Sequence, residues 1–205
     1  MIGLASCTIT IPIQTNLNDQ IMLNQPLNIR PEYKLYSEVP DGAIDFIWIQ
    51  KNGNETVDNT TYRYASETAF KKIWGDYFSS RFNQFAGDQA YIKITLKGLK
   101  MKTRALVSQG ATLLTGNSKI TREAIVEIHA VVDYRGKVYE KQFEVSLSDY
   151  NESQMISMGG TYYNLNQTNP TRQAAKLIEG AMNRSIIQFE NFLRSIIISE
   201  KPDNN

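Results

Sequence analysis

The stretch from Asn169 to about Ile198 constrains the fold most, because it is the longest uninterrupted helical pattern in the chain. Asn169 suits a helix N-cap, and Pro170 suits the first helical position, where a missing backbone N–H costs nothing. Apolar side chains recur at helical spacing along one stripe: Ala174, Ile178, Ala181, Met182, Phe189, Phe192, Leu193 and Ile196. The pattern predicts a polar opposite side made of Lys176, Asn183, Arg184, Glu190 and Arg194. A sheet of the same chain, a partner protein or a membrane surface could cover the stripe.

A second helix is predicted between Ser66 and about residue 86. Its apolar face is strongly aromatic: Phe70, Ile73, Trp74, Tyr77, Phe78, Phe82 and Phe85. Gly87 suits the residue that follows a helix end. Aromatic side chains at helical spacing usually pack in a core, so we expect this face to be buried.

Between the two helices, a strand near residues 92–104 changes phase at Gly98. Ile92, Ile94 and Leu96 are the apolar positions before the glycine, whereas Leu99 and Met101 are the apolar positions after it. A slip of one residue at a glycine is typical of a β-bulge, which keeps one face apolar throughout. The other face then carries a basic row: Lys93, Lys97, Lys100, Lys102 and Arg104. Such a row is usually solvated; its functional alternative is contact with lipid headgroups or another anionic partner.

The clearest hairpin joins residues 121–133 to residues 137–148. Apolar and polar residues alternate along both segments, and Arg135-Gly136 supplies the turn, with Gly136 free to adopt positive φ. A buried strand at 43–50 precedes the turn signal Asn52-Gly53. These strands offer apolar faces that the helices can cover.

Together these elements predict an α+β fold in which a largely antiparallel β-sheet is covered on one face by two amphipathic helices, at 66–86 and 170–198. A length of 205 residues suits one domain. We expect residues 1–30 to form an N-terminal lipobox-like remnant and tether, and residues 31–200 to form the single α+β domain.

Composition and motifs exclude several classes of function. The formal net charge of +1 argues against a dedicated nucleic-acid binder, and no run of apolar residues approaches the length of a membrane span. The sequence has no phosphate-binding glycine loop, no helical histidine pair and no calcium loop, so we expect no metal and no cofactor. The single histidine, His129, is expected to be a surface or half-buried strand residue.

The first residues carry a short pattern that involves the one cysteine of the chain. Leu4-Ala5-Ser6-Cys7 is similar to the lipobox at the end of bacterial lipoprotein signal peptides. That resemblance implies that Cys7 bears the lipids, and that Thr8, which is not an aspartate, directs the protein to the outer membrane. A charged segment and an apolar segment should stand upstream of such a box. The alternative is an incidental cysteine in a cytosolic protein.

From Tyr91 onward the layout resembles small bacterial envelope lipoproteins of the YajG type. The shared features are a strand after an amphipathic helix, the tetrapeptide Val107-Ser108-Gln109-Gly110, a hairpin turned by Arg135-Gly136, a polar loop, and a long helix entered through Asn169-Pro170. Tyr62-Arg63-Tyr64 before a helix that contains Trp74 is also similar to the auxiliary lipoproteins of envelope ABC transport systems. Both resemblances imply a role that is not enzymatic, on the periplasmic side of an envelope membrane.

We therefore expect a lipid-anchored binding or assembly component with a protein partner in the envelope and no nucleic-acid partner. The alternative is a soluble adhesin or ligand-binding module that uses the 149–168 loop or the basic row; an enzyme built on two carboxylates is a third reading. Mixed charge on the terminal helix argues against a membrane-surface helix. The apolar end of that helix, with Ile187, Ile197 and Ile198, is the expected docking site for a partner.

Overall fold

The computed structural model describes residues 8–14, 17, 25–52, 55–83, 85–86, 91–108, 119–148 and 170–200. In chain order the strands are β1 (Thr8–Thr10), β2 (Arg30–Ser37), β3 (Ile44–Asn52), β4 (Glu55–Tyr64), β5 (Tyr91–Ser108), β6 (Lys119–Tyr134) and β7 (Lys137–Ser148). The helices are α2 (Ser66–Arg81) and α5 (Pro170–Ser199), and a short 3-10 turn, η1 (Pro40–Gly42), precedes β3.

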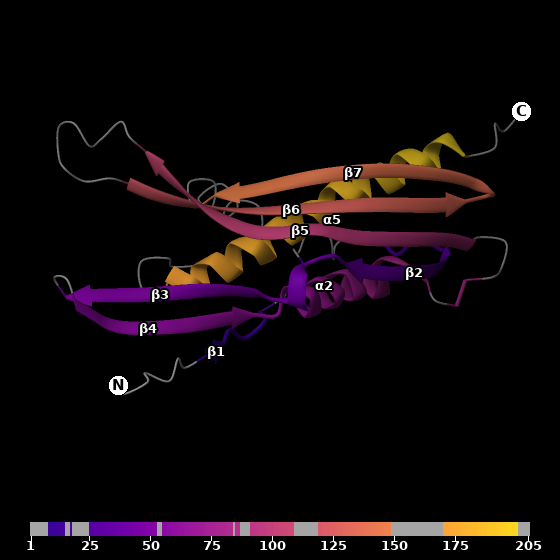
Figure 1. Cartoon of the computed structure of the whole chain (residues 1–205). Coiled ribbons are helices and arrows are strands. Elements are labelled where there is room, and N and C mark those ends of the chain that lie inside the picture. The colour runs from indigo at the N-terminus through magenta and orange to yellow at the C-terminus, as the bar shows by residue number, and fades with distance from the viewer. Residues whose placement is uncertain are drawn as a thin grey trace, which may run out of the picture.

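The strands form two sheets (Figure 1). The larger sheet has the order β2-β5-β6-β7, and the smaller has the order β1-β4-β3. Three pairs are antiparallel, β3 with β4, β5 with β6 and β6 with β7, whereas β1 with β4 and β2 with β5 pair parallel. The α+β class is confirmed, and the division of the strands between two sheets adds to it.

One face of the larger sheet is buried under the helices. Its inward side chains are apolar and almost fully buried: Ile92, Ile94, Leu96, Met101, Ala124, Val126, Ile128, Ala130, Val132, Phe143, Val145 and Leu147. Helix α5 crosses behind β6 and β7, and α2 lies under β2 (Figure 1). The predicted bulge is confirmed, since Gly98 pairs with Ile128 and Lys100 with Glu127, which leaves Leu99 as the extra residue. A Cβ at Gly98 would lie 3.1 Å from Met101 Cε, so the close approach also favours glycine.

The core between the layers is aromatic. The Phe189 ring centroid lies 5.4 Å from that of Trp74, 6.0 Å from Tyr77 and 6.1 Å from Phe78, with the rings edge to face. Such pairs add about 0.5 to 1.5 kcal/mol each beyond their area burial. These contacts join α5 to α2.

Helix α2 ends earlier than the sequence predicts. The residue after Arg81, Phe82, is extended (φ −122°, ψ 145°) and forms a bridge with Leu27. Pairing with this distant segment replaces the expected last turn. Phe85, predicted on the buried face, therefore lies beyond the helix and is 96% exposed.

Part of the segment expected to be a tether contacts the domain. Thr8–Thr10 pairs with Thr61–Arg63, and the Ile11 backbone N–H donates to the Arg63 carbonyl at 2.8 Å. Ile11 and Ile29 are both buried. The described part of the chain is therefore paired with the domain from its first residue, Thr8.

Gly136→Ala should lower the free energy of unfolding by about 1 kcal/mol, because Gly136 has φ +76° in the β6–β7 turn. Gly75→Ala is the matched control, since Gly75 lies inside α2 and both positions have open space for a methyl group. This control should raise stability by up to about 1 kcal/mol through helix propensity. Urea unfolding measures the change in stability of both variants. Changes of the same sign would contradict the positive φ assigned to Gly136.

Candidate functional site

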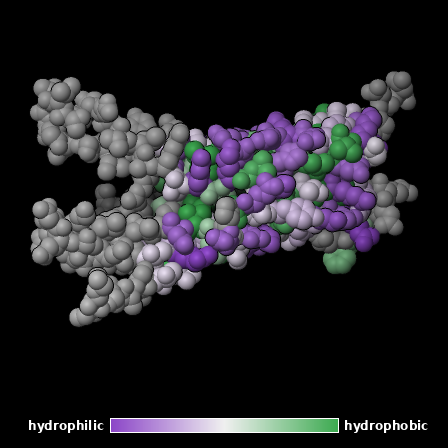
Figure 2. All heavy atoms as spheres, in the orientation of Figure 1, coloured by the Kyte–Doolittle hydropathy of each residue, from purple (hydrophilic) through white to green (hydrophobic). Residues whose placement is uncertain are grey.

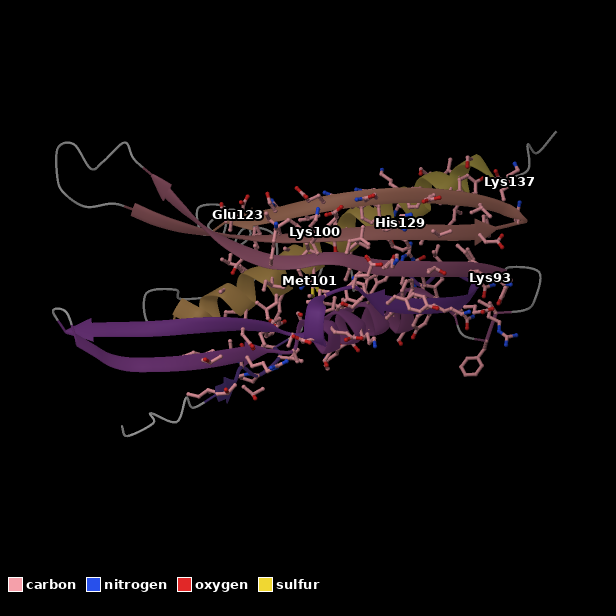
Figure 3. The ribbon with its side chains drawn as sticks, viewed as in Figure 1. Lys93, Lys100, Met101, Glu123, His129 and Lys137 are labelled. Atoms are coloured by element: carbon pink, nitrogen blue, oxygen red, sulfur yellow. The ribbon has the colours of Figure 1, made fainter. Side chains whose placement is uncertain are left out.

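The basic row lies on the solvent face of β5, opposite the helices. Lys93, Lys100 and Lys102 are exposed and Lys97 is half-buried, whereas the side chain of Arg104 lies outside the described residues. Lys93 and Lys100 can be followed along this face in Figure 3. The predicted placement of the row on one face is thus observed for its four lysines.

Two lysines of the row form ion pairs with acidic side chains beside it. Lys97 forms an ion pair with Glu38, and Lys100 forms one with Glu127, which also accepts a hydrogen bond from Gln142. The Lys100 hydrogen bond holds the pKa of Glu127 below its ordinary value. The described part of this face is mostly hydrophilic, with small apolar islands (Figure 2), and the ion pairs give it mixed charge. A mixed face attracts an anionic partner less strongly than an unpaired basic row would.

His129 lies in the same face, on β6. Its Nε2 is 2.6 Å from a carboxylate oxygen of Glu140 on β7, and Figure 3 labels His129 on this face. Within the described ranges, no group of three or more His, Cys, Asp or Glu side chains could hold a metal ion. No helix in the same ranges is long and apolar enough to cross a membrane.

The docking end of α5 is less open than the sequence predicts. Ile187 and Ile197 are half-buried and pack against the core, while Ile198 is 67% exposed. Glu200 ties this end to the β6–β7 turn, because its carboxylate accepts hydrogen bonds from Lys137 at 2.9 and 3.1 Å and from Tyr139 at 2.5 Å. Ile198 is therefore the one side chain of the three that is largely free for a partner.

Two buried glutamates on α5 were not predicted as a site. Glu179 is 7% exposed and Glu190 is 5% exposed, so the placement of Glu190 on the polar side of the helix is wrong. The two lie eleven residues apart, about three helical turns, and thus on one flank of the apolar stripe. Each accepts a hydrogen bond from a buried tyrosine: Tyr64 for Glu179 and Tyr77 for Glu190.

Glu190 is compensated by cations. Arg81 donates to it through Nε (3.0 Å to both carboxylate oxygens) and Nη2 (2.7 Å), and Arg194 Nε donates at 2.9 Å. The Tyr77 hydroxyl adds a bond of 2.6 Å. Burial alone would raise the pKa of Glu190, but these hydrogen bonds outweigh it and hold the pKa below its ordinary value. Glu190 therefore stays charged inside the fold.

The Arg81 side of this network also fixes a distant part of the chain. Arg81 Nη1 donates to the Gln25 carbonyl, and the Leu27 backbone N–H donates to the Arg81 carbonyl at 2.7 Å. The Asn83 N–H in turn donates to the Leu27 carbonyl at 3.0 Å. The segment before β2 is thus held on the end of α2.

Glu179 has a different environment. Its Oε1 accepts hydrogen bonds from the Tyr64 hydroxyl and from the Gln14 backbone N–H, both at 3.0 Å. Burial raises the pKa of Glu179, and the two hydrogen bonds and the charges of Lys176 and Lys72 only partly offset this. Burial, together with the charge of Glu179, also holds the pKa of the Tyr64 phenol far above its ordinary value. The pKa of Glu179 is thus shifted in the opposite direction to that of Glu190.

Two predicted features lie outside the described residues. These are Cys7, the predicted site of lipid attachment, and the 149–168 loop.

Comparison with known proteins gives no family. No family model matches the sequence, and no curated protein matches it. An uncharacterised protein of known structure is 8% identical with a TM-score of 0.45, over 93% of this chain and 99% of its own. A Xanthomonas campestris protein of the family DUF330 is 11% identical with a TM-score of 0.48, over 95% of this chain and 99% of its own.

These likenesses are limited to overall layout and carry no argument about activity. One of the two similar structures comes from a bacterium, and neither is described as a lipoprotein of the YajG type.

Proposed function

We propose that this protein is a lipid-anchored component on the periplasmic side of a bacterial outer membrane, and that it binds or assembles with a protein partner without catalysing a reaction. The observation that carries this proposal is the position of the single cysteine, at the end of Leu4-Ala5-Ser6-Cys7 and directly before the first strand. A lipid on Cys7 would be one residue away from the folded domain.

This short connection has a geometric consequence. Strand β1 is paired with β4, so a lipid on Cys7 would keep the domain close to the membrane surface. The β6–β7 turn and the end of α5 lie on the side of the molecule away from β1 (Figure 1). In an anchored protein these parts would face away from the membrane, toward a partner.

The partner in this proposal belongs to an envelope assembly. The layout from Tyr91 onward supports a YajG-type lipoprotein, and Tyr62-Arg63-Tyr64 before the Trp74 helix supports an auxiliary lipoprotein of an ABC transport system. Ile198, exposed at the end of α5, is the apolar side chain best placed to contact that partner. The lysines of the basic row are a secondary contact surface.

Lipidation is the decisive test. Expressed in a bacterium with its native upstream sequence, the protein should partition into the detergent phase and gain the mass of attached acyl chains. Several acyl chains at about 0.8 kcal/mol per buried CH₂ make such an anchor stable. Cys7→Ser should move the protein to the aqueous phase and remove the added mass.

Thr10→Ser is a control that lies outside the Leu4-Ala5-Ser6-Cys7 pattern, at an exposed position of β1, and it should keep both the partitioning and the added mass. An unmodified wild-type protein in the aqueous phase would overturn the proposal.

A further inference from the structure

Strand β7 is an end strand of the larger sheet, and Figure 1 shows it as the uppermost strand of that sheet. It pairs with β6 along its full length, from Lys137 to Ser148, without a register shift. Its 12 residues include no proline. Edge strands are usually short or are interrupted by prolines and bulges, which prevent further pairing. The edge of β7 is therefore long and regular enough to accept another strand.

The turn between β6 and β7 fixes which backbone groups point outward at this edge. Arg135 and Gly136 both have positive φ, 54° and 76°, as in a two-residue turn of type I′. The turn hydrogen bond then joins the flanking residues, Tyr134 and Lys137. Bonded and non-bonded pairs alternate along an antiparallel ladder. The odd-numbered residues of β7 thus bond to β6, and the even-numbered residues direct their N–H and C=O groups outward.

A contact from α5 agrees with this alternation. Arg184 Nη1 donates to the carbonyl of Ser146, an even-numbered residue, at 3.4 Å. The outward residues before Ser146 are Val138, Glu140, Gln142 and Glu144. Within the described part of the chain, none of these four makes a backbone hydrogen bond outside the sheet ladders. Four successive outward residues of β7 are therefore available to a further strand.

The two sides of the edge differ in charge. Glu140 and Glu144 lie on the solvent face, and the side chain of Glu140 is 65% exposed. On the helix side, the Lys141 ammonium lies 5.6 Å from the centroid of the half-buried Phe192 ring. Phe143 lies beside that ring, with the two centroids 6.3 Å apart. An added strand would meet two carboxylates on one face, and a lysine and an aromatic ring on the other.

This pattern defines the strand that would complement the edge. Side chains directly opposite one another on adjacent strands share a face, and opposite charges stabilise such pairs. The residues opposite Glu140 and Glu144 should therefore be Lys or Arg, four positions apart. The residue opposite Lys141 should be acidic, and the residue opposite Phe143 should be apolar so that it covers Phe192. In the antiparallel direction this complement reads Lys-Val-Thr-Glu-Lys.

We propose that the edge of β7 binds an extended segment of a partner protein as an added strand, with the charge pattern given above. Main-chain hydrogen bonds to the four outward residues supply the affinity, and the charged pairs supply the selection. The inference rests on the proposed function for the existence of a partner. The edge itself does not depend on a lipid.

The test adds a peptide with blocked ends, Thr-Val-Lys-Val-Thr-Glu-Lys-Ile-Val, to the full chain without lipid. Amide hydrogen exchange followed by NMR reports on each residue of β7. In the free protein the four outward amides should exchange fast, and those of Tyr139, Lys141 and Phe143 slowly. Saturating peptide should slow the outward amides by at least about tenfold and leave the other three unchanged.

Two charge reversals test the selection, with the affinity measured by fluorescence anisotropy of the labelled peptide. Glu144→Lys should weaken binding by about fivefold, because it replaces an attractive cross-strand pair by a repulsive one. Glu32→Lys makes the same change at an exposed position of β2, the opposite edge of the sheet, and should keep the wild-type affinity. A peptide with glutamate in place of both lysines should bind Glu144→Lys more tightly than it binds the wild type.

Three results would overturn the proposal. The first is absence of peptide binding, and the second is binding that slows none of the outward amides, which would show charge attraction without strand addition. The third is protection of the outward amides in the free protein. Protection that falls on dilution would assign the edge to a second copy of the chain, and protection that persists would assign it to the chain itself. None of these results bears on the lipidation test, and failure of lipidation leaves the peptide test unaffected.

Discussion

Glu190→Gln is expected to lower the free energy of unfolding by about 3 kcal/mol, since removing one partner of a buried ion pair leaves the other charge uncompensated. The side chains of Arg81 and Glu190 are only 5% and 6% exposed, so water cannot replace the lost carboxylate. The Tyr77 hydroxyl also loses its charged acceptor. Urea unfolding at neutral pH measures the loss.

The matched control is Asp76→Asn, which removes a carboxylate 2.9 Å from Lys72 on the surface of α2. Exposed pairs of this kind contribute about 0 to 1 kcal/mol. The double variant Arg81→Met with Glu190→Leu tests the cause, because it leaves no buried charge and should be more stable than Glu190→Gln alone. A Glu190→Gln loss as small as that of Asp76→Asn would contradict the buried network.

The same residue predicts a response to acid. Because the pKa of Glu190 is lowered in the fold, its contribution is present above the ordinary value of 4.5 and is lost as the pH falls through the lowered pKa. The stability of Glu190→Gln should therefore decline less than that of the wild type on acidification. A parallel decline of the two proteins would show that Glu190 is not a source of acid sensitivity.

Local patterns were sufficient to predict most of the elements. The stripe from Ala174 to Ile196 locates α5, the alternation around Arg135-Gly136 locates the β6–β7 hairpin, and the phase change at Gly98 locates the bulge. Each of these signals lies within a few residues of sequence. The helix, the hairpin and the bulge are each defined largely by residues that are close in sequence.

The parallel pairings and the buried glutamates could not be found in this way. The pairs β1–β4 and β2–β5 join segments more than fifty residues apart, and no periodicity within either segment identifies its partner. The sequence of α5 alone predicts that Glu190 faces solvent, because its compensating cation, Arg81, belongs to another helix. The one available signal was the position of Glu179 and Glu190 beside Ile178 and Phe189, on the same flank of the stripe.

The second large effect concerns Phe189, where α5 meets α2. Phe189→Ala should lower the free energy of unfolding by about 3 to 5 kcal/mol, the range for removal of a buried aromatic side chain. The ring is completely buried and contacts Trp74, Tyr77 and Phe78. Its removal therefore leaves a cavity between the two helices. Urea unfolding measures the loss as a lower midpoint with an unchanged slope.

Phe85→Ala is the matched control, because it removes the same side chain from a position that is 96% exposed, and its effect should stay within about 0.5 kcal/mol. Phe189→Leu refills part of the cavity and should recover a substantial part of the loss. Equal losses from Phe189→Ala and Phe85→Ala would mean that Phe189 does not join the layers. A large loss at Phe189 alone would show that α5 stabilises α2 through this ring, because α2 supplies three of the four rings that surround it.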